Sequence, residues 1–208
     1  KVFAVAPLVT KNRIRVDGDL SDWGGIRTVP FRGVKDGQER PAVRVAWRLE
    51  NLYVAISAAN PDNKITKADI GAYWHGDASE IWLDMPNLKR GNRAASKGGT
   101  HQFALFPFGW RDESLYGLEY GAHNGKGFEF VKYVKAADLG MAARQVDKGW
   151  DLEVFFPAGR LAKPAPQLGR FIGMDVSIAH GKGISYWAGG YASSWNCPAA
   201  WGDVLLGG

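Results

Sequence analysis

The residues from Trp74 to Asp84 bring an indole ring close in sequence to several carboxylates. They read Trp-His-Gly-Asp-Ala-Ser-Glu-Ile-Trp-Leu-Asp, so Glu80 follows Trp74 by six positions. A flat apolar ring can stack on the C–H face of a sugar, and an ionised carboxylate can accept hydrogen bonds from sugar hydroxyl groups. The alternative is that Trp74 plugs the edge of a hydrophobic core. Taken alone, this segment favours the core role.

The pattern from Glu80 to Asp84 predicts the strand that must position this chemistry. Side chains alternate between the two faces of a strand, so Ile81 and Leu83 can face a core, while Glu80, Trp82 and Asp84 face the other way. At ~3.3 Å per residue, Glu80 and Asp84 would lie about 13 Å apart, too far for the ~5–10 Å separation of a glycosidase pair. Binding is therefore favoured over hydrolysis at this strand.

The sequence lacks the signatures of several common catalytic centres. It contains no G-x-S-x-G nucleophile motif, and its four histidines are scattered without H-E-x-x-H spacing. Cys197 is the only cysteine, which excludes an internal disulfide and a Cys-rich zinc or iron–sulfur site. Haem binding through His and Met stays open because Met85, Met141 and Met174 are present, although C-x-x-C-H is absent.

A second cluster of acids lies near the start of the chain. Asp17, Asp19 and Asp22 surround Gly18 just ahead of Trp23. Asp and Gly are typical of tight turns, which predicts a turn here with Trp23 as a packing anchor. Oxygen ligands on one loop also suit calcium, although the spacing is not that of an EF-hand. Calcium at Asp17 and Asp19 therefore remains as the alternative.

Short strand patterns separated by Gly and Pro dominate the remaining sequence. The cleanest is a hairpin formed by residues 43–49 and 52–57, with Glu50 and Asn51 between them. Helical periodicity is scarce, with one short turn expected within residues 136–143 and another within residues 157–161. This pattern predicts a β-sandwich rather than a parallel α/β sheet. Further strands are expected at residues 102–108, 128–135, 150–156, 171–179 and 184–187.

The composition indicates a chain with one sizeable hydrophobic core. With 208 residues and 46% hydrophobic content, we expect a single domain over residues 1–208. No apolar run approaches the ~18 residues of a membrane span. Basic residues from Lys89 to Lys97 indicate a solvated loop, so we expect neither nucleic-acid nor membrane partners despite a net charge of +5. The chain begins without Met or a signal-length apolar segment, which suggests a mature or excised chain.

Tryptophan is abundant, with nine in the chain. Four of them, Trp74, Trp110, Trp195 and Trp201, lie in Gly-rich stretches that are expected to be loops. Indoles in such loops are poorly placed to serve a core alone, which favours a stacking surface.

Five segments in a particular order carry a resemblance to a known family. They are IRVDGDLSDW, VRVAWRLENLYVAIS, WHGDASEIWLD, GWDLEVFFPAGRL and SSWNCPAAWGDVLL, and they extend from Ile14 to Leu206. In this order they resemble the family 9 carbohydrate-binding module and its wider superfamily. The resemblance implies an antiparallel, jelly-roll-like β-sandwich that binds a glycan or oligosaccharide without cleaving it. It also implies structural calcium, no organic cofactor, and attachment to a larger polysaccharide-active protein that is secreted, periplasmic or at the cell surface.

The resemblance also assigns site residues. In the family two Trp side chains clamp a terminal sugar, and a Glu six residues after the first Trp hydrogen-bonds its hydroxyls; here these positions hold Trp74 and Glu80. Trp195 is the choice for the second clamp residue, with Trp187 in reserve. The resemblance further implies an amide contact from Gln102 and a polar contact from Asn196, while Trp201 and Gly202 match a structural pair. The identity of the sugar stays open, and so do two other functions: a haem-binding electron-transfer domain on a related sandwich, and a polysaccharide-degrading enzyme.

Overall fold

The computed structural model describes most of the chain. The described residues are 2–11, 13–31, 41–60, 64–67, 74–89, 91, 99–108, 116–122, 128–180, 183–189 and 197–208. For residues 30, 116–122 and 128–137 the description is of the backbone only.

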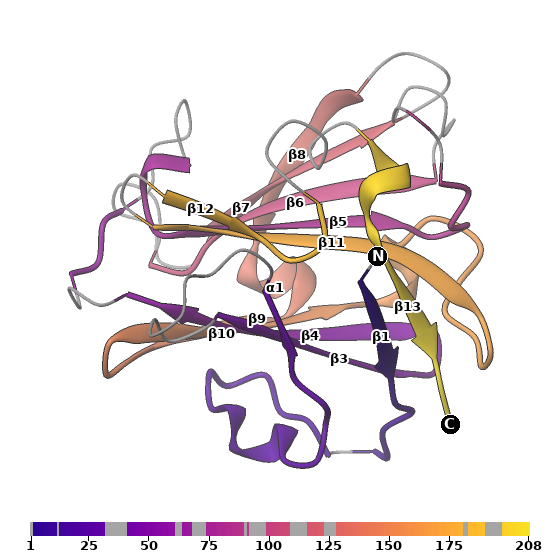
Figure 1. Cartoon of the computed structure of the whole chain (residues 1–208), viewed down its shortest axis with the longest axis horizontal. Helices are drawn as coiled ribbons and strands as arrows, with labels where there is room; N and C mark the ends of the chain where they lie inside the picture. The colour runs from indigo at the N-terminus through magenta and orange to yellow at the C-terminus, as the bar shows by residue number, and fades with distance from the viewer. Residues whose placement is uncertain are drawn as a thin grey trace.

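Two β-sheets lie face to face and form a sandwich (Figure 1). The eight-stranded sheet contains β1 (Phe3–Ala6), β5 (Ala78–Asp84), β6 (Thr100–Phe106), β7 (Tyr116–Ala122), β8 (Phe128–Lys135), β11 (Phe171–His180), β12 (Gly183–Tyr186) and β13 (Gly202–Leu206). The five-stranded sheet contains β2 (Val29–Pro30), β3 (Ala42–Arg48), β4 (Asn51–Ala59), β9 (Met141–Val146) and β10 (Gly149–Phe156). The predicted β-sandwich is thereby confirmed.

The strand order places β5 in the interior of the larger sheet. That order is β1-β13-β11-β5-β6-β7-β8, with β12 also paired to β11, while the smaller sheet runs β2-β3-β4-β10-β9. Among the named strands all pairs are antiparallel except β1 with β13, which are parallel. These two strands are the first and last of the chain, so no short turn forces them to be antiparallel.

The hydrophobic core lies between the two sheets and follows the predicted alternation. Ile81 and Leu83 of β5 belong to it, as do Val43 and Val45 of β3. Successive residues point to opposite faces of a strand, so Glu80 and Trp82 lie on the face of β5 that is turned away from this core. The predicted orientation of the strand is therefore correct.

The hairpin between β3 and β4 turns one residue earlier than predicted. Leu49 and Glu50 both have positive φ, at 47° and 65°, and Arg48 pairs with Asn51. Two residues with positive φ form the type I′ turn whose twist matches that of a β-hairpin. Leu49, the last residue of the predicted first strand, lies instead in this turn and is exposed.

In the described residues helical structure consists of short turns. An α-helical turn, α1 (Ala136–Leu139), follows β8 of the larger sheet and precedes β9 of the smaller one. Three 3-10 turns are described at Leu20–Trp23, Ala158–Arg160 and Pro198–Ala200. In the described part of the chain no helix has the length and apolar character needed to cross a membrane.

Candidate functional site

Three polar side chains from neighbouring strands converge on the outer face of the larger sheet. Gln102 on β6 donates from Nε2 to Oε1 of Glu80 on β5, and Ser177 on β11 donates from Oγ to the second carboxylate oxygen at 3.2 Å. Glu80 pairs directly with Ser177 in the strand register, while Gln102 is opposite Trp82. Donors on both sides fix the orientation of the carboxylate.

Trp74 lies just before β5 and is the exposed indole of this region. Its side chain is 40% exposed, and its ring meets that of His75 edge to face, with centroids 5.9 Å apart. The other described tryptophans are all buried: Trp23, Trp47, Trp82, Trp150, Trp187 and Trp201. A core role explains Trp23, Trp47, Trp150 and Trp187, whereas Trp74 presents apolar surface to solvent.

Trp187, the reserve choice for the second clamp residue, is fully buried within the core and has no exposed ring face to offer a sugar. Trp201 is also fully buried, which agrees with a structural role for the Trp201-Gly202 pair. A Cβ at Gly202 would lie 2.9 Å from Cζ3 of Trp187, so only glycine fits there. Trp110, Trp195 and Asn196 lie outside the described residues, and their assigned roles stay predictions.

The sequence pattern did not predict an aromatic pair that lies beside Glu80. Tyr186 on β12 is opposite Ser177 in the register, and its ring stacks on that of Trp82 at a centroid distance of 6.2 Å and an angle of 24°. Trp82 is buried, while Tyr186 is half-buried. The half-buried ring thus belongs to the same sheet face as Glu80, where it can contribute apolar surface.

Asp84 lies at the opposite end of β5 from Glu80 and is buried in a different environment. Its Oδ2 accepts a hydrogen bond from the backbone N–H of Lys89 at 3.2 Å, while its Oδ1 has no partner among the described residues. Burial raises the pKa of Asp84 above its ordinary value, and the hydrogen bond and charge of Lys89 only partly oppose this. The ionised carboxylate is therefore a destabilising group in the folded protein.

We expect the Asp84→Asn variant to be more stable than the wild type at pH 7, and we expect this stability difference to be smaller at pH 4. Above the raised folded-state pKa, Asp84 is ionised in both states and its burial penalty is fully present. Below the unfolded-state pKa it is protonated in both states and the penalty is absent. The stability gain at pH 7 should shrink as the pH falls through this range. Urea unfolding of both proteins at the two pH values measures it, and a gain that grows toward pH 4 would contradict this interpretation.

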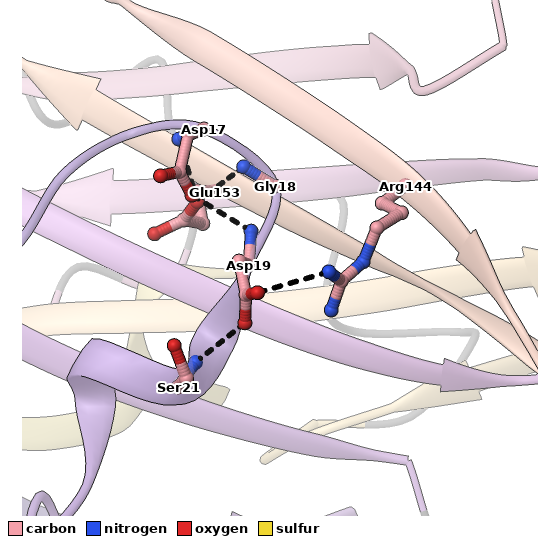
Figure 2. A network of polar contacts seen from close by, with 6 residues as sticks. All are labelled: Asp17, Gly18, Asp19, Ser21, Arg144 and Glu153. Atoms are coloured by element: carbon pink, nitrogen blue, oxygen red, sulfur yellow. Dashed lines mark hydrogen bonds and ion pairs between the residues drawn. The ribbon is translucent and has the colours of Figure 1, made fainter.

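The acidic loop at the start of the chain is held against the smaller sheet by Glu153 (Figure 2). Glu153 on β10 accepts hydrogen bonds from the backbone N–H groups of Asp17 and Gly18 at 2.9 and 2.6 Å. Its other oxygen accepts from Nε1 of Trp23 at 2.7 Å. Trp23 is buried beneath the loop, so the predicted turn and packing anchor are both present.

The carboxylates of Asp17 and Asp19 are engaged within this loop. Asp17 Oδ1 accepts from the N–H of Asp19, and Asp19 accepts from the N–H of Ser21, both at 2.9 Å. Asp19 also pairs with the guanidinium of Arg144 at 3.0 Å (Figure 2). These hydrogen bonds, from Ser21 first and then Arg144, lower the pKa of Asp19. Arg144 thus supplies the positive charge that a calcium ion would bring.

The fit to calcium at this loop is poor. Calcium takes about six to eight oxygen ligands, whereas the described residues contain no group of three or more His, Cys, Asp or Glu side chains that could hold a metal ion. Arg144 donates a hydrogen bond to the carboxylate of Asp19, which would have to be one of the calcium ligands. Structural calcium therefore stays a prediction that rests on the family resemblance.

The geometry on the outer face of the larger sheet suits a ligand with both apolar faces and hydroxyl groups. Trp74 offers a ring face, while Glu80, Gln102 and Ser177 form a linked set of acceptors and donors. Such a combination binds and orients a polyhydroxylated ring. Of the predicted site residues, the structure brings Glu80 and Gln102 into contact and leaves Trp74 exposed just before β5.

Solved structures with this fold include sugar-binding proteins. A family 9 carbohydrate-binding module from Caldicellulosiruptor kristjanssonii in complex with cellotriose aligns with a TM-score of 0.66 at 14% identity, over 100% of this chain and 94% of that one. The same module in complex with glucose gives 0.66 at 13% identity, over 100% and 96%. A putative carbohydrate-binding protein from Bacteroides uniformis gives 0.64 at 14% identity, over 98% of each chain. At these identities the likeness shows the fold.

The family is shown by a separate comparison of the sequence. No curated protein matches the chain significantly. A family model described as "Carbohydrate family 9 binding domain-like" matches residues 20–208, which is nearly the whole chain. The five ordered segments, the sandwich and this match agree, and the chain belongs to the family 9 carbohydrate-binding domains.

Proposed function

We propose that this protein is a non-catalytic module that binds a terminal or exposed sugar at Trp74 and Glu80. The observation that carries the proposal is a carboxylate held by Gln102 and Ser177, with a 40% exposed indole six residues earlier in the chain. Trp74 stacks on one face of the sugar ring, and Glu80 and Gln102 hydrogen-bond its hydroxyl groups.

The second half of the proposed site covers the other face of the sugar. Trp195 is proposed to cover the other face of the sugar, with Asn196 as a further polar contact, on the basis of the family resemblance. Tyr186 adds apolar surface beside Glu80, which the strand register and its stacking on Trp82 support.

Binding rather than catalysis is supported by the use of the other carboxylates in this segment. Asp77 accepts hydrogen bonds from Thr66 and Trp150, and Asp84 lies at the far end of β5. Neither is therefore positioned as the partner that Glu80 would need as a glycosidase acid or base. We extend the proposal to an accessory role in a larger polysaccharide-active protein that is secreted, periplasmic or at the cell surface, as the family resemblance implies.

Glucose and cellotriose are the first ligands to test, because solved structures of a module with the same fold hold them. We expect calorimetric titration to show saturable binding of at least one of them, with a Kd between about 1 μM and 1 mM. The bound sugar should also raise the Tm, since it binds the folded state only. Absence of binding to both sugars and to a broad glycan array would contradict the proposed function.

A further inference from the structure

Asp77 lies midway between Trp74 and Glu80, and its buried carboxylate is the centre of a hydrogen-bond network. Oδ2 accepts from the backbone N–H of Thr66 at 2.6 Å, and the N–H of Asp77 donates back to the carbonyl of Thr66 at 2.7 Å. Oδ1 accepts from Nε1 of Trp150 at 3.2 Å and pairs with Nδ1 of His180 at 2.8 Å. Asp77 itself is only 2% exposed.

The partners of Asp77 come from three separate parts of the sandwich. Thr66 belongs to the segment 64–67 that precedes β5, Trp150 belongs to β10 of the smaller sheet, and His180 ends β11 of the larger sheet. Trp150 is fully buried in the core between the sheets. The carboxylate of Asp77 thus links the segment before β5 to both sheets. One of its partners, Trp150, is held rigidly by core packing.

This position allows Asp77 to set where Trp74 lies relative to Glu80. Glu80 is held independently, because β5 pairs with β6 and β11 on either side. Trp74 lies outside β5, in a 3-10 turn with His75, three residues before Asp77. A stacking ring contributes most to affinity when its position is set before the ligand arrives. The hydrogen bonds of Asp77 fix the backbone at residue 77, and this fixed backbone limits where Trp74 can lie.

We propose that Asp77 is the positioning residue that holds the Trp74 ring in place relative to Glu80, with His180 as its partner at the surface. Asp77 need not touch the sugar and acts through the backbone between residues 74 and 80. The side chain of His180 is 26% exposed, so it is the part of this network that can be changed with least damage to the core. The expected effect of Asp77 on sugar affinity rests on the proposed function. Its expected effect on the position of the Trp74 ring does not.

The chain contains a matched control for Asp77. Glu153 is also a buried carboxylate, and it also accepts from one indole N–H and from backbone N–H groups, those of Trp23, Asp17 and Gly18. It holds the loop at the start of the chain on the outer face of the smaller sheet. Glu153→Gln and Asp77→Asn each replace an acceptor oxygen by an NH₂ group that faces a donor, so both should lower the Tm, by about 5 °C.

The first measurement follows the indole N–H signal of Trp74 in the sugar-free protein by ¹H–¹⁵N NMR. We expect Asp77→Asn to shift or broaden this signal, and His180→Ala to do the same to a smaller extent. Glu153→Gln should leave it unchanged while altering the signal of Trp23. A Trp74 signal that is unmoved in Asp77→Asn, or moved equally by Glu153→Gln, would overturn the assignment whether or not any sugar binds. Should Asp77→Asn fail to fold, His180→Ala alone decides by the same criterion.

The second measurement is cellotriose affinity by calorimetry, at a temperature where circular dichroism shows all variants folded. Asp77→Asn should weaken binding about tenfold, which corresponds to about 1.4 kcal/mol, and Glu153→Gln should stay within about twofold of the wild type. In a Trp74→Phe background the effect of Asp77→Asn should shrink, because the two changes act on one contact. Unchanged affinity in Asp77→Asn, with weakened binding in Trp74→Ala, would contradict the role of Asp77 and leave the sugar site intact. Unchanged affinity in Trp74→Ala would instead contradict the proposed function.

Discussion

The Trp74→Ala variant is expected to lose about a hundredfold in affinity for cellotriose while keeping its fold. A sugar stacked on one ring face covers about half of the ~150–250 Å² that an aromatic side chain buries. At ~25 cal/mol per Å² the loss of about 100 Å² amounts to about 2.5 kcal/mol, which is close to a hundredfold. Because Trp74 is 40% exposed, its removal should change the Tm by no more than about 3 °C. Calorimetry measures the affinity, and circular dichroism verifies the fold.

Phe171 provides the matched control for this variant. It is an exposed aromatic residue on the same sheet, at the first position of β11, and its ring contacts Phe3 at a centroid distance of 6.1 Å. Phe171→Ala should leave the affinity for cellotriose unchanged. Equal losses in the two variants would mean that the effect is not specific to Trp74, and full binding by Trp74→Ala would remove Trp74 from the site.

The Glu80→Gln variant is the second change with a large expected effect on binding. The carboxylate of Glu80 accepts from Gln102 and Ser177 and can accept further hydrogen bonds from sugar hydroxyl groups. An amide loses the negative charge and turns one acceptor into a donor, so we expect the affinity to fall by about tenfold or more, since hydrogen bonds to charged groups contribute ~1.5–3 kcal/mol. Titration with cellotriose at constant pH measures this loss.

Asp84→Asn is the control for Glu80→Gln, because it makes the same chemical change on the same face of β5. Asp84 lies beside Lys89 and is opposite Thr100, at the other end of the strand. We expect its affinity for cellotriose to match that of the wild type, even though its stability changes with pH. Equal affinity of Glu80→Gln and Asp84→Asn would show that Glu80 does not contact the sugar.

Local patterns in the sequence predicted the strand that carries the site. Alternation from Glu80 to Asp84 is set by the geometry of a single strand, and the structure confirms which residues face the core. The prediction of Trp23 as an anchor succeeded for the same reason, because a turn and a nearby apolar residue are local features. Leu49 was misplaced since alternation alone does not reveal where a hairpin turns.

Contacts between distant segments could not be predicted in this way. Ser177 lies 97 residues from Glu80 in the sequence, and Gln102 lies 22 residues away. The resemblance pointed to Gln102. Ser177 and Tyr186 belong to the site only because β11 lies next to β5 in the sheet and β12 pairs with β11. No spacing in one sequence encodes that order.

The role of Asp77 shows the same limit. In the sequence it was one more acid near Glu80, available for acid–base chemistry. In the structure Thr66, Trp150 and His180 surround its carboxylate, and Trp150 belongs to the opposite sheet. Burial and long-range hydrogen bonds, rather than residue type, make it a candidate for positioning the site.

The most direct test of the sugar site is a ¹H–¹⁵N NMR titration of the wild-type protein with cellotriose, observed at the tryptophan indoles. The account predicts that the indole N–H signal of Trp74 shifts in a saturable manner. The signals of Trp23 and Trp47 should stay in place, because both rings are buried and donate to Glu153 and to the carbonyl of Gly207. Saturable binding by calorimetry with an unmoved Trp74 signal would contradict the account and place the sugar elsewhere on the protein.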